Sequence, residues 1–291
     1  MGASVRISKY NKKASMKANK LRMQREKQYI KSFNKIYNQI MDDIENEIYK
    51  YATKYAQENE ISIGQARQLI NVNIDGNPYK ITRLQLLQNN IFDAFTQNMI
   101  QENTKAKNHF YNEMLETMDD LKTLLNMNVP TAKRIMMQFD SIINAEYKGL
   151  TFDDRLWKNQ QGLKNVLDNT IYKSVIVGKN PKTWASDLIK EINKDVGNYR
   201  YISNRLAITE TTRVVTDVQV KSFVESGFDA YIFNPLPNAC EKCIPLKNKI
   251  IPIDKAVQGV NKPPMHPFCK CAISGYKLEW AKEDGETHLI Y

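Results

Sequence analysis

The clearest structural signal in the chain is the segment FNKIYNQIMDDIENEIYKYATKY at residues 33–55. Its apolar residues recur at steps of three and four, which places them along one stripe of a helix, while Asn, Lys, Asp and Glu fill the opposite face. The stripe consists of Phe33, Ile36, Tyr37, Ile40, Met41, Ile44, Ile48, Tyr51, Ala52 and Tyr55. The segment therefore predicts an amphipathic helix that buries this stripe in a core.

Similar stripes extend through most of the chain. No Gly or Pro occurs between Tyr79 and Val129, where helical spacing continues with an expected break near residues 103–104. Further helices are expected at about 130–147, from Thr151 to Gly178, from Asn180-Pro181 onward, and at about 199–226. We interpret the stripes as core and not as a cofactor-binding surface, because ordinary amphipathic helices have this pattern.

Proline and cysteine change the character of the chain near residue 228. Seven of the ten prolines lie between Pro235 and Pro267, and all four cysteines fall in the same region. Short β-prone runs also occur there, at 231–233 and 250–251. The sequence predicts a mainly α fold, with an elongated multi-helix body at residues 28–227 and a small C-terminal α+β or β module with its tail at residues 228–291.

Positive charge is concentrated at the start of the chain. The 42 basic and 32 acidic residues give a net charge of +10, and residues 1–27 hold nine basic residues and one acidic residue. We expect a basic, mobile arm at residues 1–27, which either contacts DNA or an acidic partner surface through counterion release or is a solvated tail. The residues expected to contact nucleic acid are Lys9, Lys12, Lys13, Lys17, Lys20, Arg22 and Arg25.

Membrane and secretory segments are not expected. The longest aliphatic runs, such as Val175-Ile176-Val177, are far shorter than a membrane span, and no apolar stretch follows the basic N-terminal residues. The composition is that of a globular chain made in the cytoplasm, with 42% hydrophobic and 25% charged residues.

The residues with the most distinctive chemistry are Cys240-Glu-Lys-Cys243 and His266-Pro-Phe-Cys269-Lys-Cys271. Zinc prefers four thiolate or imidazole ligands at tetrahedral corners, and a two-residue spacer lets one tight turn direct two ligands to one point. Five candidates exist for four positions. The preferred set is Cys240, Cys243, His266 and Cys269, with Cys271 as the main substitute, and the zinc is expected to be structural.

Four other interpretations of the cysteines are weighed. The four thiols could pair as disulfides after release to an oxidising medium, or they could be plain buried cysteines. A catalytic zinc is disfavoured because no second histidine and no carboxylate is spaced to activate water. A redox role is disfavoured because no strand-then-helix context of the thioredoxin kind surrounds the first pair.

Four segments together resemble the phage minor head proteins of the Mu protein F-like type, which are portal-associated proteins of tailed phages. These segments are Ala207-Ile208-Thr209-Glu210-Thr211-Thr212-Arg213, Cys240-Glu-Lys-Cys243, Ile244-Pro-Leu-Lys-Asn-Lys-Ile250 and Pro263-Pro-Met-His266-Pro-Phe-Cys269-Lys-Cys271. The resemblance covers about residues 150–275. Ile208 stands where the family commonly has Arg, and Lys270 replaces the usual Arg, which keeps the charge but loses the guanidinium fork.

The resemblance implies a non-enzymatic virion component in few copies at or near the portal, which assists head assembly, DNA packaging or DNA delivery. Its implied partners are the portal protein, the major capsid protein and packaged double-stranded DNA. Its implied location is the head interior or the vicinity of the portal, after assembly in the bacterial cytoplasm. Thr209, Glu210 and Arg213 would then be structural residues of the family motif.

Two other functions are weighed against this one. An ADP-ribosyltransferase or toxin-like enzyme is disfavoured because Glu210 lacks a second glutamate, and Glu210 with Arg213 is better interpreted as an i,i+3 ion pair. His109 and His288 are expected to be surface histidines, which leaves no nucleophilic triad. A zinc-knuckle DNA-binding protein is disfavoured because the region around the cysteines is nearly neutral and has no basic helix.

Overall fold

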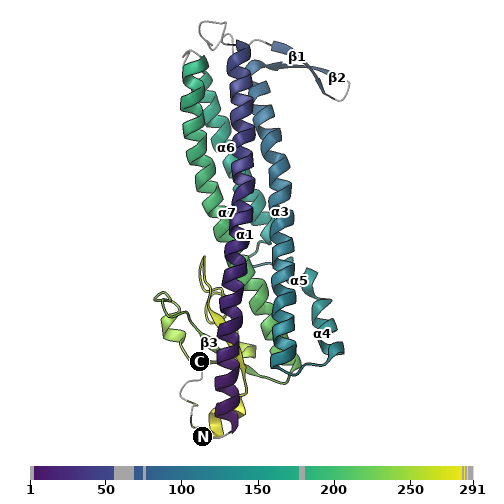
Figure 1. Ribbon diagram of the computed structural model, residues 1–291, viewed down its shortest axis with the longest axis vertical. Helices are drawn as coiled ribbons and strands as arrows, with labels where there is room; N and C mark the ends of the chain where they lie inside the picture. Colours follow the sequence, from purple (N-terminus) through teal and green to yellow (C-terminus); the bar gives the residue numbers. More distant parts are fainter. Residues whose placement is uncertain are drawn as a thin grey trace. The chain divides into compact units, whose positions relative to one another are not determined.

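The computed structural model describes the chain except for residues 1–2, 56–68, 75–76, 177–180, 284, 286 and 288–290 (Figure 1). The described residues are mostly helical, which confirms the mainly α prediction. Their seven helices are α1 (Ala3–Tyr55), α3 (Arg83–Leu124), α4 (Val129–Met136), α5 (Phe139–Ile143), α6 (Phe152–Ile176), α7 (Pro181–Glu225) and α8 (Leu278–Glu283). None of these helices is both long enough and apolar enough to cross a membrane.

The strands form two small antiparallel sheets. One is the hairpin of β1 (Leu69–Ile74) and β2 (Asn77–Thr82), and the other has the order β4-β3-β5, from β3 (Ala230–Asn234), β4 (Ile250–Pro252) and β5 (Ala272–Tyr276). Tyr231 pairs with Ile251 on one side and with Gly275 on the other. The C-terminal sheet confirms the expected β-prone runs, whereas the β1–β2 hairpin was not predicted, although Ile70, Val72 and Ile74 alternate at the period of a strand.

The long helices are more continuous than the sequence suggested. No break occurs at residues 103–104, where the Thr104 hydroxyl donates a hydrogen bond to the Ile100 carbonyl at 3.0 Å and stays within the helix. Likewise, α7 runs through Gly197 as one helix where two were expected. The end of α7 is as predicted. The helix stops before Gly227, which has a φ of 78°, a conformation that glycine adopts at low cost.

The chain divides into two compact units that differ from the expected domains. Unit 1 comprises residues 1–30, 106–153 and 204–291, and unit 2 comprises residues 31–105 and 154–203. The expected boundaries after residues 27 and 227 do not coincide with these units and stay a prediction. The reason lies in contacts remote in sequence, such as the 2.6 Å hydrogen bond that the Ser15 hydroxyl of α1 donates to the Ile273 carbonyl of β5.

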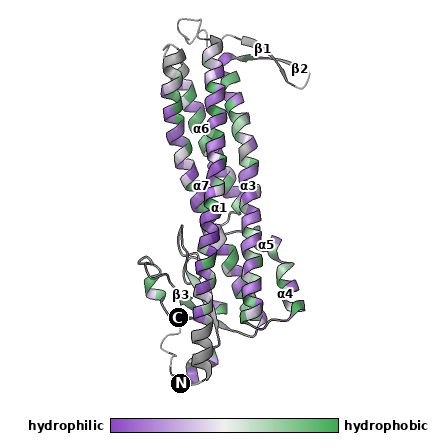
Figure 2. Cartoon of the chain, in the orientation of Figure 1, coloured by the Kyte–Doolittle hydropathy of each residue, from purple (hydrophilic) through white to green (hydrophobic). Residues whose placement is uncertain are grey.

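Unit 2 is a set of helical segments packed through apolar stripes. The stripe predicted from residues 33–55 is buried wherever its side chains are described, apart from half-buried Met41. Hydrophilic and hydrophobic residues alternate around these helices (Figure 2). The other buried residues of unit 2 come from α3, α6 and α7 and include Leu87, Ile91, Phe95, Leu163, Leu167, Ile171, Leu188 and Ile192.

A buried carboxyl interrupts this apolar core. Glu102 is 2% exposed, and the Tyr37 hydroxyl oxygen lies 3.1 Å and 3.2 Å from its two carboxylate oxygens and 2.7 Å from the Ser203 hydroxyl. Burial raises the pKa of Glu102 to about 7 and outweighs the hydrogen bonds from Ser203, Tyr37 and Gln160, which lower this pKa.

Glu102→Gln should stabilise the protein at alkaline pH. Between pH 4.5 and about 7 the folded chain keeps a proton on Glu102 that the unfolded chain releases, so the free energy of unfolding falls as the pH rises through this window. The variant should exceed the wild type by on the order of 2 kcal/mol at pH 8 and match it at pH 4. Urea unfolding at both pH values measures this difference, and exposed Glu191→Gln serves as the control. An equal pH dependence in both chains would contradict the prediction.

Candidate functional site

Two tight turns of unit 1 carry the predicted metal ligands. Cys240 and Cys243 lie in the turn that leads into the 3₁₀ helix Ile244–Leu246, and His266 and Cys269 lie in the turn before β5. Each turn is closed by the same bond, in which the fourth residue's amide donates to the first residue's carbonyl, at 2.9 Å for Cys243 to Cys240 and 3.0 Å for Cys269 to His266. The equal spacing in sequence therefore produces equal backbone geometry.

Three of the ligand atoms have the spacing of a tetrahedral zinc site. Sulfur ligands 2.3 Å from zinc are about 3.8 Å apart at tetrahedral angles, and a sulfur and a nitrogen ligand are about 3.5 Å apart. The Cys240 and Cys243 sulfurs are 3.7 Å apart, and His266 Nε2 lies 3.5 Å from Cys243 Sγ and 3.0 Å from Cys240 Sγ. The first two distances match these values and the third is shorter, so the three residues could hold a metal ion such as zinc.

The histidine is already oriented for metal binding. His266 Nδ1 lies 2.7 Å from the Pro267 carbonyl oxygen, which can only accept, so Nδ1 carries the proton. The other ring nitrogen, Nε2, faces the two thiols and is placed to bind a metal ion together with them. This arrangement of a ligating nitrogen and a second nitrogen bonded to a carbonyl is common among zinc-binding histidines.

Cys243 joins two groups of ligands. Its sulfur lies within 4.8 Å of the ligand atoms of Cys240 and His266 and, in a second group, of Cys269 and Cys271. All five predicted ligands thus converge, and the geometry leaves Cys269 and Cys271 as alternatives for the fourth position. All four thiols are free, which disagrees with the disulfide interpretation, and 3.7 Å is far longer than a sulfur–sulfur bond.

The electrostatics of the thiols also suits a cation. Burial raises the pKa of the Cys243 thiol to about 12, and interaction with Cys269 raises that of Cys271 as well. A hydrogen bond from Cys271 lowers the pKa of Cys269 to about 5. The cluster therefore favours one thiolate, and a bound divalent cation would favour more of them by supplying the missing positive charge.

Helix α7 fixes the second turn through two threonines. The Thr209 hydroxyl accepts a 3.1 Å hydrogen bond from the Phe268 amide, and the Thr212 hydroxyl donates one of 2.7 Å to the Cys269 carbonyl. Phe268 has a φ of 62°, a left-handed conformation that costs about 1–2 kcal/mol for a residue with a side chain. The threonines thus hold a strained turn in the conformation that presents His266 and Cys269.

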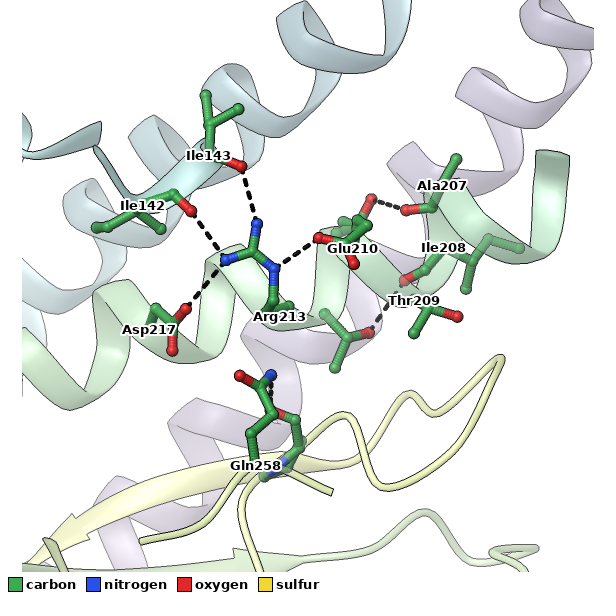
Figure 3. Close-up of polar contacts among 12 residues, drawn as sticks. Ile142, Ile143, Ala207, Ile208, Thr209, Glu210, Arg213, Asp217 and Gln258 are labelled. Carbon is green, nitrogen blue, oxygen red and sulfur yellow. Dashed lines mark hydrogen bonds and ion pairs between the residues drawn. The ribbon is translucent and has the colours of Figure 1, made fainter. Parts of the chain in front are cut away.

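The same helix contains a buried ion pair that extends to α5 (Figure 3). Arg213 Nε donates to Glu210 Oε2 at 2.6 Å, and both side chains are almost fully buried. The Arg213 terminal nitrogens donate to the Ile142 and Ile143 carbonyls at 2.8 Å and 3.0 Å. Arg213 therefore satisfies carbonyl groups at the C-terminal end of α5, and the predicted i,i+3 pair is confirmed.

This ion pair is linked to the segment before His266. Asp217 Oδ2 lies 3.4 Å from an Arg213 terminal nitrogen, and Asp217 Oδ1 lies 2.6 Å from Lys262 Nζ. The residues Thr209, Glu210, Thr212, Arg213 and Asp217 therefore connect α7 to α5 and to the ligand-bearing segment within unit 1. We call these five residues the α7 motif.

Lys270, between two candidate ligands, is bound by α1. Its carbonyl accepts a 2.9 Å hydrogen bond from the Asn19 amide, and its ammonium forms an ion pair with buried Glu26. The positive charge that Lys270 shares with the family's usual arginine is therefore paired with a carboxylate of the same chain.

The residues expected to bind nucleic acid do not form a separate arm, because residues 3–27 are the first part of α1. Arg22 is 4% exposed, and Arg25 is bound by both oxygens of Glu113 at 2.8 Å and 2.9 Å. Lys12 donates to the Asn248 side chain at 2.6 Å. The exposed members of the set are Lys13, Lys17 and Lys20, and the side chain of Lys9 lies outside the described part.

His109 was expected at the surface, and this expectation is wrong. Its ring is 9% exposed and stacks on Tyr29, with 4.0 Å between ring centroids, and burial lowers its pKa to about 4. The position of His109 in the middle of a helix does not by itself tell whether its side chain is buried. The available signal was that His109 is next to Phe110, on the buried face of α3. His288 lies outside the described residues.

Comparison with known protein families gives one match, and it covers the region of the candidate site. Residues 165–274 match the model of the family described as Phage Mu protein F like protein, which supports a phage Mu protein F-like family member. The match covers less than half of the chain and includes the α7 motif, β3, β4, the first three residues of β5 and all five candidate ligands. No curated protein and no solved structure matches the chain.

Proposed function

We propose, from the match to the phage Mu protein F-like family, that this chain is a structural protein of a tailed-phage virion, a minor head protein associated with the portal. In this proposal it assists head assembly, DNA packaging or DNA delivery and catalyses no reaction. Its partners are the portal protein, the major capsid protein or both. It acts inside the head or near the portal.

The observation that carries the proposal is that the polar residues of the matched region bind other groups of the same protein. Glu210 and Arg213 bind each other and backbone carbonyls, and Thr209 and Thr212 bind the ligand-bearing turn. These polar groups therefore hold α7, α5 and the ligand-bearing turn together. A transferase would instead need Glu210 to meet a substrate, and this carboxylate is 1% exposed.

The virion assignment is tested with purified phage particles. Mass spectrometry should detect this chain in particles banded by density, in fewer copies than the major capsid protein, and the chain should co-purify with the portal protein encoded at the same locus. A separate co-purification with the major capsid protein alone shows which of the two proteins the chain binds. Absence of the chain from particles that are infectious would overturn the proposal.

We also propose that the cluster binds one structural zinc ion through Cys240, Cys243, His266 and a fourth thiolate. When bound, zinc would join the turn before the 3₁₀ helix to the turn before β5. The support is the convergence of the Cys240, Cys243 and His266 ligand atoms and the orientation of the His266 ring. A small three-stranded sheet has little core of its own, so such a link would contribute much of its stability.

Serine substitution should identify the fourth ligand. We expect Cys269→Ser to reduce bound zinc by tenfold or more, because the turn closed by the His266 carbonyl presents Cys269, and Cys271→Ser to keep about one equivalent per chain. Elemental analysis of reduced protein after dialysis measures both. The opposite ranking would assign the fourth position to Cys271, and no zinc in the wild type would remove the site.

Contact with packaged DNA is proposed for the exposed lysines of α1. Lys13, Lys17 and Lys20 recur at steps of four and three, so they share one face of the helix. Such contacts are independent of sequence and weaken with salt.

The combined change Lys13→Gln and Lys20→Gln should make the salt dependence of DNA binding shallower by about two units on a log–log plot. Fluorescence anisotropy with duplex DNA at several salt concentrations measures this slope. The combined change Lys133→Gln and Lys282→Gln, at exposed positions of α4 and α8, removes the same charge and is the control. An unchanged slope would show that these lysines do not contact phosphate.

A further inference from the structure

Unit 1 contains a cavity of about 290 Å³ that the zinc proposal does not use. Its walls come from the first part of α1, the end of α3, the end of α7 and β5. One wall is apolar and includes Leu21, Leu121, Leu124, Val215 and Phe223. The other wall is polar and carries three cations and one carboxylate; it includes Lys17, Asn19, Arg22 and Arg25 of α1 and Asp120 of α3.

The polar wall has one buried cation, Arg22, that forms no ion pair. Arg22 is 4% exposed, and the carboxylates that act on it electrostatically are Glu26 and Glu113. Glu113 is bound by Arg25, and Glu26 is bound by Lys270 through Oε1, while its buried Oε2 has no hydrogen-bond partner. Among the described residues, no carboxylate oxygen lies within 4.0 Å of Arg22, and its Nε has no hydrogen-bond partner. Because a buried charge is costly unless it is paired, this wall favours an anionic ligand.

The combination of both walls specifies the ligand further. A free inorganic anion would leave the leucines and Phe223 in contact with water, whereas an apolar molecule would leave the charge of Arg22 unpaired. We infer that this cavity binds a carboxylate joined to an apolar group. The volume suits roughly eight carbon atoms, as in a medium-chain fatty acid or the C-terminal residues of a partner polypeptide that ends in leucine.

Calorimetric titration of the full chain with sodium octanoate tests the inference. We expect octanoate to bind at least tenfold more tightly than 1-octanol, which has the same tail without the charge. A second arm uses a tetrapeptide ending in Leu-Leu with a free C-terminus, and its C-terminal amide as the control. Tighter binding of octanoate points to a small acid, and tighter binding of the free peptide points to a polypeptide terminus.

Substitutions then localise the binding to the cavity. Lys17→Gln should weaken octanoate binding about threefold, whereas Lys20→Gln, with the same change of charge outside the cavity lining, should leave it unchanged. Arg22→Met should weaken binding at least tenfold. Since Arg22 also contacts the Lys270 carbonyl, Ala18→Phe, which fills the cavity from a half-buried position, is the second variant and should abolish binding.

Three results would overturn the inference. They are equal binding of octanoate and octanol, unchanged octanoate binding by Ala18→Phe, and no binding of either carboxylate at about 1 mM.

Discussion

Cys243→Ser should reduce the zinc content from about one equivalent per chain to less than a tenth of this value. Cys243 is the thiol shared by both groups of ligands and is fully buried, so its loss removes a ligand from either possible set of four. We expect unit 1 to lose at least about 4 kcal/mol of stability, a fraction of the roughly 10–16 kcal/mol of apparent binding free energy in small zinc modules.

The chelator dependence separates metal loss from a packing defect. A strong chelator should lower the melting temperature of the wild type towards that of Cys243→Ser, and it should leave the variant almost unchanged. Both measurements use reduced protein and differential scanning calorimetry. If the chelator lowers both melting temperatures equally, or if the variant keeps its zinc, Cys243 is not a ligand.

Arg213→Met should destabilise unit 1 by about 3–5 kcal/mol. The substitution removes the guanidinium that balances the buried charge of Glu210, and it takes the side-chain donors away from the Ile142 and Ile143 carbonyls. Methionine fills much of the same volume, so the loss comes mainly from the polar contacts. The measurement is urea unfolding followed by the fluorescence of Trp280, the tryptophan of unit 1, in a Trp157→Phe and Trp184→Phe background.

An exposed arginine provides the matched control. Arg134 pairs with Glu225 at 2.8 Å, but its side chain is 59% exposed, so Arg134→Met should cost less than about 1 kcal/mol. Adding Glu210→Gln to Arg213→Met should recover about 1–2 kcal/mol, because the buried charge that Arg213 balanced is removed. Equal effects of the two arginine substitutions would show that the buried pair does not stabilise α7 against α5.

The two predictions concern one connected structure. Thr209 and Thr212 bind the turn that presents His266 and Cys269, while Glu210 and Arg213 bind α5 from the same helix. Damage to the ion pair should therefore lower the apparent affinity for zinc as well, by a smaller factor than loss of a ligand. This coupling suits an architectural role, in which the polar residues of the family match hold helices and turns together.

Local spacing was enough to predict most of the helical segments and the residues of the cysteine–histidine cluster. Period and charge along residues 33–55 identified the buried stripe, because a helix repeats its faces every three or four residues. The two-residue spacers likewise predicted that Cys240, Cys243, His266 and Cys269 converge, since each spacer closes one turn. The pairing of Glu210 with Arg213 follows from the same short-range geometry.

Contacts between residues remote in sequence could be identified only from the folded structure. Basic residues 12–25 look like a solvated arm in the sequence, yet Ser15, Asn19 and Arg22 are buried because α1 packs on β5 and on the turn before it. The carbonyl partners of Arg213 and the stacking of His109 on Tyr29 have no local signature either. Local sequence fixes backbone conformation through near neighbours, whereas burial and counter-charges depend on segments that meet only after folding, and these contacts set the boundaries of the units.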